Sequence, residues 1–212
     1  MKSREFCEEF ASRVRPLAEQ GDAEVQFRLG FMYAKGQGVA RDYSQAVEWF
    51  RKAAEQGVAV AQYNLSLAYS RGEGVAQDDV QAAAWTRKAA EQEVAVAQYN
   101  LGFMYAKGQG VAQDDVQAAA WFRKAAEQGD ADAQHNLGFM YAKGQGVARE
   151  DVQAAAWFRK AAEQGDADAQ YTLGFMYANG QGVAEDYMQA MVWLGRAAEQ
   201  GDEKAQKSLD SM

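Results

Sequence analysis

The amino-acid sequence predicts an all-α fold, a solenoid in which pairs of antiparallel helices repeat along the chain. Three observations predict it: a leucine followed by a small residue recurs every 36 residues, apolar residues within each repeat follow helical spacing, and the 212 residues include only one proline. The recurring dipeptides are Leu29-Gly30, Leu65-Ser66, Leu101-Gly102, Leu137-Gly138 and Leu173-Gly174.

The repeats divide the chain into five full units between two shorter ends. Residues 94–129 and 130–165 differ at only five positions, which indicates duplication of one structural unit. Leu17-Ala18-Glu19-Gln20-Gly21 matches the end of a repeat, so residues 1–21 are predicted to form an N-terminal capping helix that Pro16 kinks or ends. Residues 202–212 are more polar and predict a C-terminal capping half-repeat. The predicted repeats are residues 22–57, 58–93, 94–129, 130–165 and 166–201.

The first helix of a repeat is expected over a segment such as residues 23–35. A rotation of about 100° per residue separates its side chains into two faces. The core face carries Val25, Leu29, Met32 and Tyr33. The opposite face carries Glu24, Phe27, Phe31, Ala34 and Lys35. A packed helix pair does not need aromatic residues on that second face, so they are the first indication of a binding surface.

The loop Lys35-Gly36-Gln37-Gly38 recurs in similar form in every repeat and is interpreted as a tight turn between helices. A phosphate-binding loop would need a following Lys-Ser/Thr or a preceding strand, and neither is present. We expect Val39 to anchor the loop on the core.

The second helix has clear start and stop signals. An acidic residue with glutamine three positions later can cap its first turn. These pairs start at Asp42, Asp78, Asp114, Glu150 and Asp186. A left-handed stop is expected at Gly57, Gly129, Gly165 and Gly201. Glu93 occupies the same position in the second repeat, so the junction after that repeat is predicted to be the least regular.

Composition limits the function classes. The net charge of −8 disfavours binding to nucleic acid or anionic lipid, which requires clustered cations. Cys7 is the single cysteine, so an internal disulfide and a cysteine metal site are excluded. We expect no cofactor, no metal and no catalytic residue. The absence of an apolar N-terminal run favours a cytoplasmic location, or a periplasmic or secreted one if an export signal has been removed.

The third repeat resembles the Sel-one-like repeat (SLR) family, a relative of the tetratricopeptide repeats. The residues that carry the resemblance are Ala97-Gln98-Tyr99-Asn100-Leu101-Gly102, Tyr105, Gly108-Gln109-Gly110-Val111, Asp114, Ala118, Trp121 and Ala125-Ala126-Glu127-Gln128-Gly129. The resemblance implies a right-handed superhelix with the first helices on its concave face. It also implies adaptor roles in signalling, protein quality control or bacterial contact with host cells.

The second repeat departs most from this pattern. It has Ser66 for glycine, Leu67-Ala68 for Phe-Met, Thr86 for phenylalanine and Glu93 for glycine. Uniform packing is therefore not expected there. Cysteine-rich relatives linked to penicillin binding or hydrolysis have disulfides in each unit, which this sequence cannot form.

The candidate binding site is the aromatic and amide face of the first helices. Aromatic rings supply contact area at little entropic cost, and a carboxamide can bond a peptide backbone. The alternative is that neighbouring first helices cover these rings. The candidate residues are Phe27, Phe31, Tyr63, Asn64, Tyr99, Asn100, Phe103, His135, Asn136, Phe139, Tyr171 and Phe175.

Two residue types are assigned structural roles. The tryptophans recur on the alanine face of the second helices, which indicates core packing. They are Trp49, Trp85, Trp121, Trp157 and Trp193. His135 is the single histidine and stands where other repeats have Phe or Tyr, so it is interpreted as a surface aromatic substitute and not as a base or metal ligand.

The leading functional hypothesis is a noncatalytic adaptor that binds a protein or peptide. We expect the apolar middle repeats to contact a hydrophobic segment and Asp132 and Asp168 to favour a basic one. One alternative is an exported bacterial factor that contacts a host. A hydrolase is the weaker alternative, because the polar residues recur as caps and solvated faces and not as a cluster of unlike titratable groups.

Overall fold

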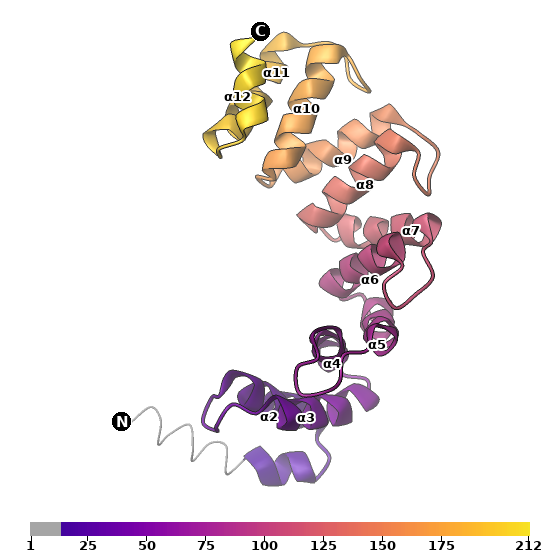
Figure 1. The fold of residues 1–212 in the computed structure, drawn as a ribbon, viewed down its shortest axis with the longest axis vertical. Helices are drawn as coiled ribbons and strands as arrows, with labels where there is room; N and C mark the ends of the chain where they lie inside the picture. The colour runs from indigo at the N-terminus through magenta and orange to yellow at the C-terminus, as the bar shows by residue number, and fades with distance from the viewer. Residues whose placement is uncertain (1–13) are drawn as a thin grey trace. The chain divides into compact units, whose positions relative to one another are not determined.

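The computed structural model describes residues 14–212, and every regular element in this range is a helix (Figure 1). The all-α prediction is therefore confirmed. We call the leading helix of each repeat the first helix; these are α2 (Ala23–Lys35), α4 (Ala59–Arg71), α6 (Ala95–Lys107), α8 (Ala131–Lys143) and α10 (Ala167–Asn179). The second helices are α3 (Tyr43–Glu55), α5 (Asp79–Glu91), α7 (Asp115–Glu127), α9 (Asp151–Glu163) and α11 (Tyr187–Glu199). A last helix is α12 (Glu203–Asp210).

The helices pack in chain order within two compact units. In the N-terminal unit, residues up to 104 together with 108–112, α2 packs on α3, α3 on α4, and α4 on α5. In the C-terminal unit, residues 105–107 together with 113–212, the same succession runs from α7 to α12. In each unit a second helix thus contacts the first helices of its own and of the following repeat, as a solenoid requires.

The N-terminal cap falls largely outside the described residues, including Phe6, Cys7 and Phe10. Residues 14–19 are helical, and the N–H of Gln20 still donates to the carbonyl of Pro16 at 3.1 Å. The helix therefore does not end at Pro16, which corrects one of the two predicted outcomes. A kink would involve residues before 14.

The core combines leucine, methionine and alanine from the first helices with alanine and large apolar side chains, such as Phe50 and Phe158, from the second. Leu29 and Met32 are buried as predicted, but Val25 and Tyr33 are only partly buried. Gln26 and Gly30 take the remaining buried positions. The buried face of α2 is therefore rotated from the predicted one, so that it includes the polar residue Gln26. Hydrogen bonds make this residue acceptable in the interior.

Gln26 belongs to a hydrogen-bonded glutamine pair. The amide of Gln26 donates to the carbonyl of Ala18 at 3.0 Å, and its oxygen accepts from the amide of Gln56 at 2.8 Å. Gln56 also donates to the carbonyl of Gly21. Buried polar groups are tolerated when they are bonded in this way. The same three bonds recur around the buried residues Gln62, Gln134 and Gln170.

The glycine loops have the structural role predicted for them. Gly36 and Gly38 have φ angles of 67° and 73°, in the left-handed region that glycine adopts without strain. Val39 packs against the core, as do the equivalent Val75 and Val111. The loops also touch the preceding repeat, because a Cβ on Gly146 would overlap the carbonyl of Asp115.

The predicted caps form at four of five second helices. The carboxylate of Asp42 accepts from the N–H of Gln45 at 3.1 Å, and Asp78, Asp114 and Asp186 do the same. Glu150 makes no side-chain cap. Its extra methylene places the carboxylate too far from the first turn for the short contact that aspartate makes.

The junction after the second repeat keeps the hydrogen bonds of the glycine junctions. Glu93 has a φ of 63°, its N–H donates to Ala90, and the N–H of Val94 donates to Ala89. Gly57 and Val58 make the equivalent bonds. The junction is nevertheless the least regular of the five, as predicted: the φ of Glu93 lies 30° or more below the 93–97° of the glycines, and the bond from Val94 is the longest of its kind at 3.3 Å. Glu93 remains in a left-handed conformation that costs roughly 1–2 kcal/mol for a residue with a side chain.

We expect Glu93→Gly to raise the free energy of unfolding by about 1 kcal/mol, because it removes this strain and part of the gain is offset by the freer unfolded chain. Urea unfolding followed by circular dichroism measures the change. Glu93→Ala is the matched control, since it removes the charge but retains the strain. An equal gain in both variants would attribute the effect to charge and contradict the prediction.

Candidate functional site

One exposed phenylalanine per repeat marks the outer face of four first helices. Phe31 is 38% exposed, Phe103 40%, Phe139 46% and Phe175 50%. In α4 the equivalent residue is Leu67, which is partly buried. We call these four phenylalanines the phenylalanine row. Large apolar rings exposed at regular intervals are typical of a surface that contacts another molecule.

The other aromatic candidates are half-buried between helices. These are Phe27, Tyr63, Tyr99, His135 and Tyr171. The ring of Phe27 packs 5.9 Å from that of Phe50 in α3 and 6.3 Å from that of Phe31. These five side chains lie at the edge of the core. The alternative interpretation, in which neighbouring helices cover the rings, therefore applies to them and not to the phenylalanine row.

Tyr63 illustrates how this set is held. Its hydroxyl accepts a hydrogen bond from the amide of Asn100 at 2.8 Å, which links α4 to α6. Burial raises the pKa of Tyr63 above its usual 10, and the Asn100 bond and the charge of Arg71 offset part of this rise. The phenol is therefore neutral at physiological pH and acts as a fixed contact between repeats.

His135 is also fixed in place. Its ring lies edge-on to Phe158 at 5.6 Å, and its Nδ1 lies 3.0 Å from a carboxylate oxygen of Asp166. The same oxygen atom caps α10 through the N–H of Ala169. The histidine is thus a half-buried link between repeats, which corrects the interpretation of a surface ring. It stands in for tyrosine by packing and by a polar contact at the ring edge.

The amide candidates are less free than the sequence alone indicates. One amide N–H of Asn64 donates to the carbonyl of Val60 at 2.7 Å, and Asn136 donates to Asp132 at 2.8 Å. Both bonds stay within the amide's own helix. An Asn side chain has two N–H donors and one acceptor, so these residues keep capacity for a ligand while one donor is engaged.

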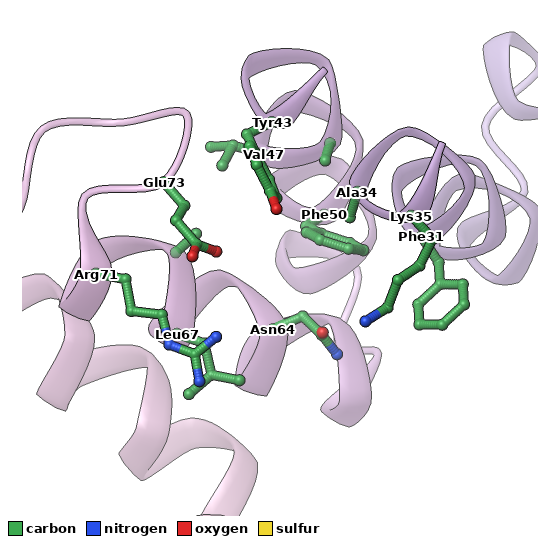
Figure 2. A pocket seen from close by; sticks show the side chains of 12 residues that line it. Phe31, Ala34, Lys35, Tyr43, Val47, Phe50, Asn64, Leu67, Arg71 and Glu73 are labelled. Carbon is green, nitrogen blue, oxygen red and sulfur yellow. The ribbon is translucent and has the colours of Figure 1, made fainter. Parts of the chain in front are cut away.

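A pocket of about 220 Å³ opens between α2, α3 and α4 (Figure 2). Its apolar wall is formed by Phe31, Ala34, Ala46, Val47, Phe50, Leu67 and Ala68. Its polar wall is formed by Lys35, Tyr43, Asn64, Arg71 and Glu73. All these residues belong to the N-terminal unit, and Phe31 and Asn64 belong to the predicted site. We call this the first pocket.

A second pocket of about 200 Å³ lies on the other side of Leu67 and Arg71, which line both pockets. It too is confined to the N-terminal unit. Its remaining lining residues are Ser66, Ser70, Thr86, Asn100, Phe103, Met104 and Gln109. The two pockets are therefore successive depressions along α4, separated by a leucine and an arginine.

The unusual residues of the second repeat line these pockets. In other repeats a glycine of the first helix faces a large side chain: a Cβ on Gly30 would lie 2.7 Å from the ring of Phe50, and one on Gly138 3.0 Å from the ring of Phe158. The equivalent pair is Ser66 and Thr86, both buried. The smaller Thr86 accommodates Ser66 and leaves space where a phenylalanine ring would lie. The expectation of non-uniform packing in this repeat is confirmed in this form.

Charge in the first pocket is not neutralised within the described part of the chain. The ammonium of Lys35 lies 5.7 Å from the ring of Phe31, and neither Lys35 nor Arg71 forms an ion pair with any residue of the described range 14–212. Glu73 stands where other repeats have glutamine; Gln109, for example, donates to Asp79 at 3.3 Å. Tyr43 replaces that aspartate, so Glu73 is released from this contact between repeats.

Sequence reasoning missed Val47, Tyr43 and Glu73 as site residues. The second helices were assigned to the core, and nothing in their periodicity indicates which residues border a pocket. Glu73 did carry a signal, because glutamine occupies its position in the other four repeats. Because Glu73 differs from the glutamine of the other repeats and adds a charge, comparison of the repeats with one another would have identified it.

The tryptophans behave mostly as predicted. Trp49, Trp85 and Trp193 are buried, which confirms core packing for them, whereas Trp121 and Trp157 are half-buried. A lysine or arginine of the same helix lies about 4 to 5 Å from each ring and covers it. Each of these rings thus has a cation closer to it than the 5.7 Å that separates Lys35 from Phe31 and Lys143 from Phe139.

Residues 14–212 hold no group of three or more His, Cys, Asp or Glu side chains arranged to bind a metal ion. No helix within this range is both long enough and apolar enough to cross a lipid bilayer.

Comparisons with known proteins identify relatives over nearly the whole chain. A model of the Sel1 repeat matches residues 23–58, 59–94, 95–130, 131–166 and 167–202. The solved structure of a protective antigen from uropathogenic Escherichia coli, which displays an SLR fold, is 44% identical, with a TM-score of 0.87 over 91% of this chain and 41% of that chain. A Sel1 repeat protein from Oxalobacter formigenes is 38% identical, with a TM-score of 0.78 over 90% of this chain and 76% of that chain.

A shorter match is to the secretory immunoglobulin A-binding protein of Escherichia coli, which is 44% identical over 41 residues, 19% of this chain and 8% of that protein. The chain thus spans less than half of the Escherichia coli proteins it matches. The likeness to SLR structures confirms the predicted fold class, an α-solenoid of antiparallel helix pairs.

Proposed function

Because the chain belongs to the Sel1 repeat family, whose members typically serve as protein-interaction scaffolds, we propose that it binds a protein or peptide on the solvent-exposed face of its first helices, which carries the phenylalanine row. The observation that carries the proposal is the phenylalanine row, with one ring 38 to 50% exposed in four of the five repeats. Burying the exposed half of each such ring against a partner provides roughly 1 kcal/mol before the costs of association.

The charges along this face favour different segments of a partner. Exposed Asp132 and Asp168 near the phenylalanine row of the C-terminal unit favour a basic segment, as the sequence analysis expects. In the N-terminal unit the equivalent positions are Glu24, which pairs with Arg28 at 3.2 Å, and the exposed Val60 and Val96, which favour an apolar segment at the second and third repeats. A noncatalytic mode of action is consistent with these features, since they supply contact area and charge.

The variant that tests this proposal removes exposed rings and spares the interior. We expect Phe31→Ala, Phe103→Ala and Phe139→Ala together to abolish capture of the partners that bind the intact chain, because three anchors are lost. The measurement is affinity capture from lysate of the producing organism, followed by mass spectrometry and by titration of the recovered partner. A change at Asn100 is a poorer probe because its amide bonds Tyr63.

A matched control comes from three exposed valines of the second helices. Val80, Val116 and Val152 are 62 to 68% exposed, so their replacement by alanine removes apolar surface elsewhere without disturbing the core. The control variant is expected to retain its partners. Retention of the same partners by the phenylalanine variant, with unchanged circular dichroism, contradicts the proposal.

A second candidate function is an exported bacterial protein that contacts a host protein. It is favoured by the likeness to a protective antigen and to a secretory immunoglobulin A-binding protein of Escherichia coli. Fractionation of the producing cells with an antibody against the chain tests it. Recovery solely from the cytosol would exclude this candidate and leave an intracellular adaptor.

A further inference from the structure

The first pocket combines apolar walls with two cations that have no carboxylate partner among the described residues. From this combination we infer that it binds a peptide segment in which an apolar side chain adjoins a single carboxylate: the apolar side chain occupies the pocket and the carboxylate bonds Lys35 and Arg71. The inference rests on the proposed function, since Phe31 belongs both to this pocket and to the phenylalanine row.

The apolar part of the site follows from its lining. Val47 and Phe50 are buried residues of α3 that border the pocket, and Leu67 of α4 borders it from the other side. A volume of about 220 Å³ is open to a side chain the size of leucine or phenylalanine. Such a side chain would exclude water from these walls, which is the term that favours its insertion.

The polar part follows from the positions of the charges. Figure 2 shows the Lys35 ammonium and the Arg71 guanidinium with the Asn64 side chain between them in this view. Lysine and arginine are donors without acceptors, and Asn64 has a second N–H beside the one given to Val60. A carboxylate is the small group that accepts from all three, and its charge strengthens each bond.

Glu73 limits which ligands are suitable. In Figure 2 its carboxylate lies across the pocket from Lys35, so the site as a whole carries two positive charges and one negative charge. Arg71 lies on the same side of the pocket as Glu73 in this view. A polyanion such as nucleic acid would therefore be repelled by Glu73, whereas a single carboxylate placed between Arg71 and Lys35 is attracted by two charges and repelled by one. A peptide backbone N–H near Glu73 would satisfy its oxygens.

The fourth repeat offers a comparison without this combination. Lys143 in α8 has the position of Lys35 and lies 5.7 Å from the ring of Phe139, as Lys35 does from Phe31. The repeat that follows Lys143 has Gly174, Phe175 and Met176 where the repeat that follows Lys35 has Ser66, Leu67 and Ala68, so the smaller residues that open space beside α4 are not present there. Lys143 therefore provides a matched cation next to an exposed ring.

The test uses two sets of fluorescein-labelled, C-terminally amidated octapeptides that differ in one residue. In one set glutamate follows phenylalanine or leucine, and in the other glutamine replaces the glutamate. Fluorescence anisotropy with the full chain is expected to show binding of at least one glutamate peptide, about tenfold tighter than its glutamine counterpart, with a difference that shrinks as salt is added.

Variants then locate the site. The pair Lys35→Glu and Arg71→Glu is expected to weaken the glutamate peptide by about tenfold or more and the glutamine peptide by less than about twofold. Lys143→Glu should leave both unchanged. Equal binding of the two peptide sets by the intact chain, no binding of either set, or an equal loss with Lys143→Glu overturns the inference.

These outcomes are separable from failure of the proposed function. If the phenylalanine variant loses its cellular partners while the charge variants keep them, the outer face binds proteins and the carboxylate inference is wrong. If the phenylalanine variant keeps its partners, the proposed function fails whatever the peptides show.

Discussion

Replacing Gly146 by alanine is expected to lower the free energy of unfolding of the chain by about 3 kcal/mol. Gly146 has a φ of 68°, a conformation that costs a residue with a side chain roughly 1–2 kcal/mol. In addition, a Cβ at this position would overlap the carbonyl group of Asp115 and lie 2.8 Å from the backbone nitrogen of Val116. Backbone atoms cannot rotate away, so the loop must move off α7, at a further cost of about 1–3 kcal/mol.

Gly129→Ala is the matched control for this change. Gly129 has a φ of 95°, also in the left-handed region, but a Cβ there would have no atom within 4 Å. Its expected cost is therefore the backbone part alone, about 1 kcal/mol. Guanidinium unfolding followed by tryptophan fluorescence measures both variants. Equal losses in the two would show that the loop does not press on the preceding repeat.

Gln134→Ala is expected to lower the free energy of unfolding by about 2–3 kcal/mol. Gln134 is buried, donates to the carbonyl of Ala126 at 3.1 Å and accepts from Gln164 at 2.9 Å. Removing the Gln134 side chain leaves the buried carbonyl of Ala126 without its side-chain donor, which costs about 1–3 kcal/mol. It also leaves a cavity, which costs further stability. Gln164 is exposed and recovers its bond from water, which limits the loss.

Gln145→Ala provides the comparison on a loop. Gln145 also donates to a neighbouring repeat, through Asp115 at 3.1 Å, but it is partly exposed, so water replaces its bond and the expected cost is below about 1 kcal/mol. A double-mutant cycle between Gln134 and Gln164 should give a coupling of about 1 kcal/mol. A cost for Gln134→Ala no larger than that of Gln145→Ala would contradict a structural role for the glutamine pair.

Both predictions concern contacts that join one repeat to the next, and these contacts bear on binding. The loop of Gly146 touches α7 of the preceding repeat, and the amide of Gln134 joins α8 to the carbonyl of Ala126 in α7. Neighbouring repeats held in this way present Phe139 and Phe175 on a rigid support. A surface organised before it meets its partner loses less entropy on binding, which favours affinity.

The sequence by itself determined the helices and their order. The 36-residue period, the aspartate caps and the loop glycines are local signals, each of which depends on a few neighbouring residues, and the structure reproduces them with the exception of the Glu150 cap. The phenylalanine row also follows from helix rotation alone, because a residue opposite the core face stays exposed unless another element covers it.

Only the tertiary structure decided which predicted site residues are covered and where space is left. Tyr63 and His135 are half-buried because partners from the following repeat, Asn100 and Asp166, reach them. Gln26 is buried because Gln56, thirty residues later, bonds it. The first pocket exists because α3 and the smaller residues of α4 meet there. Each outcome depends on side chains that are distant in sequence, and a helical period carries no information about which of them come into contact.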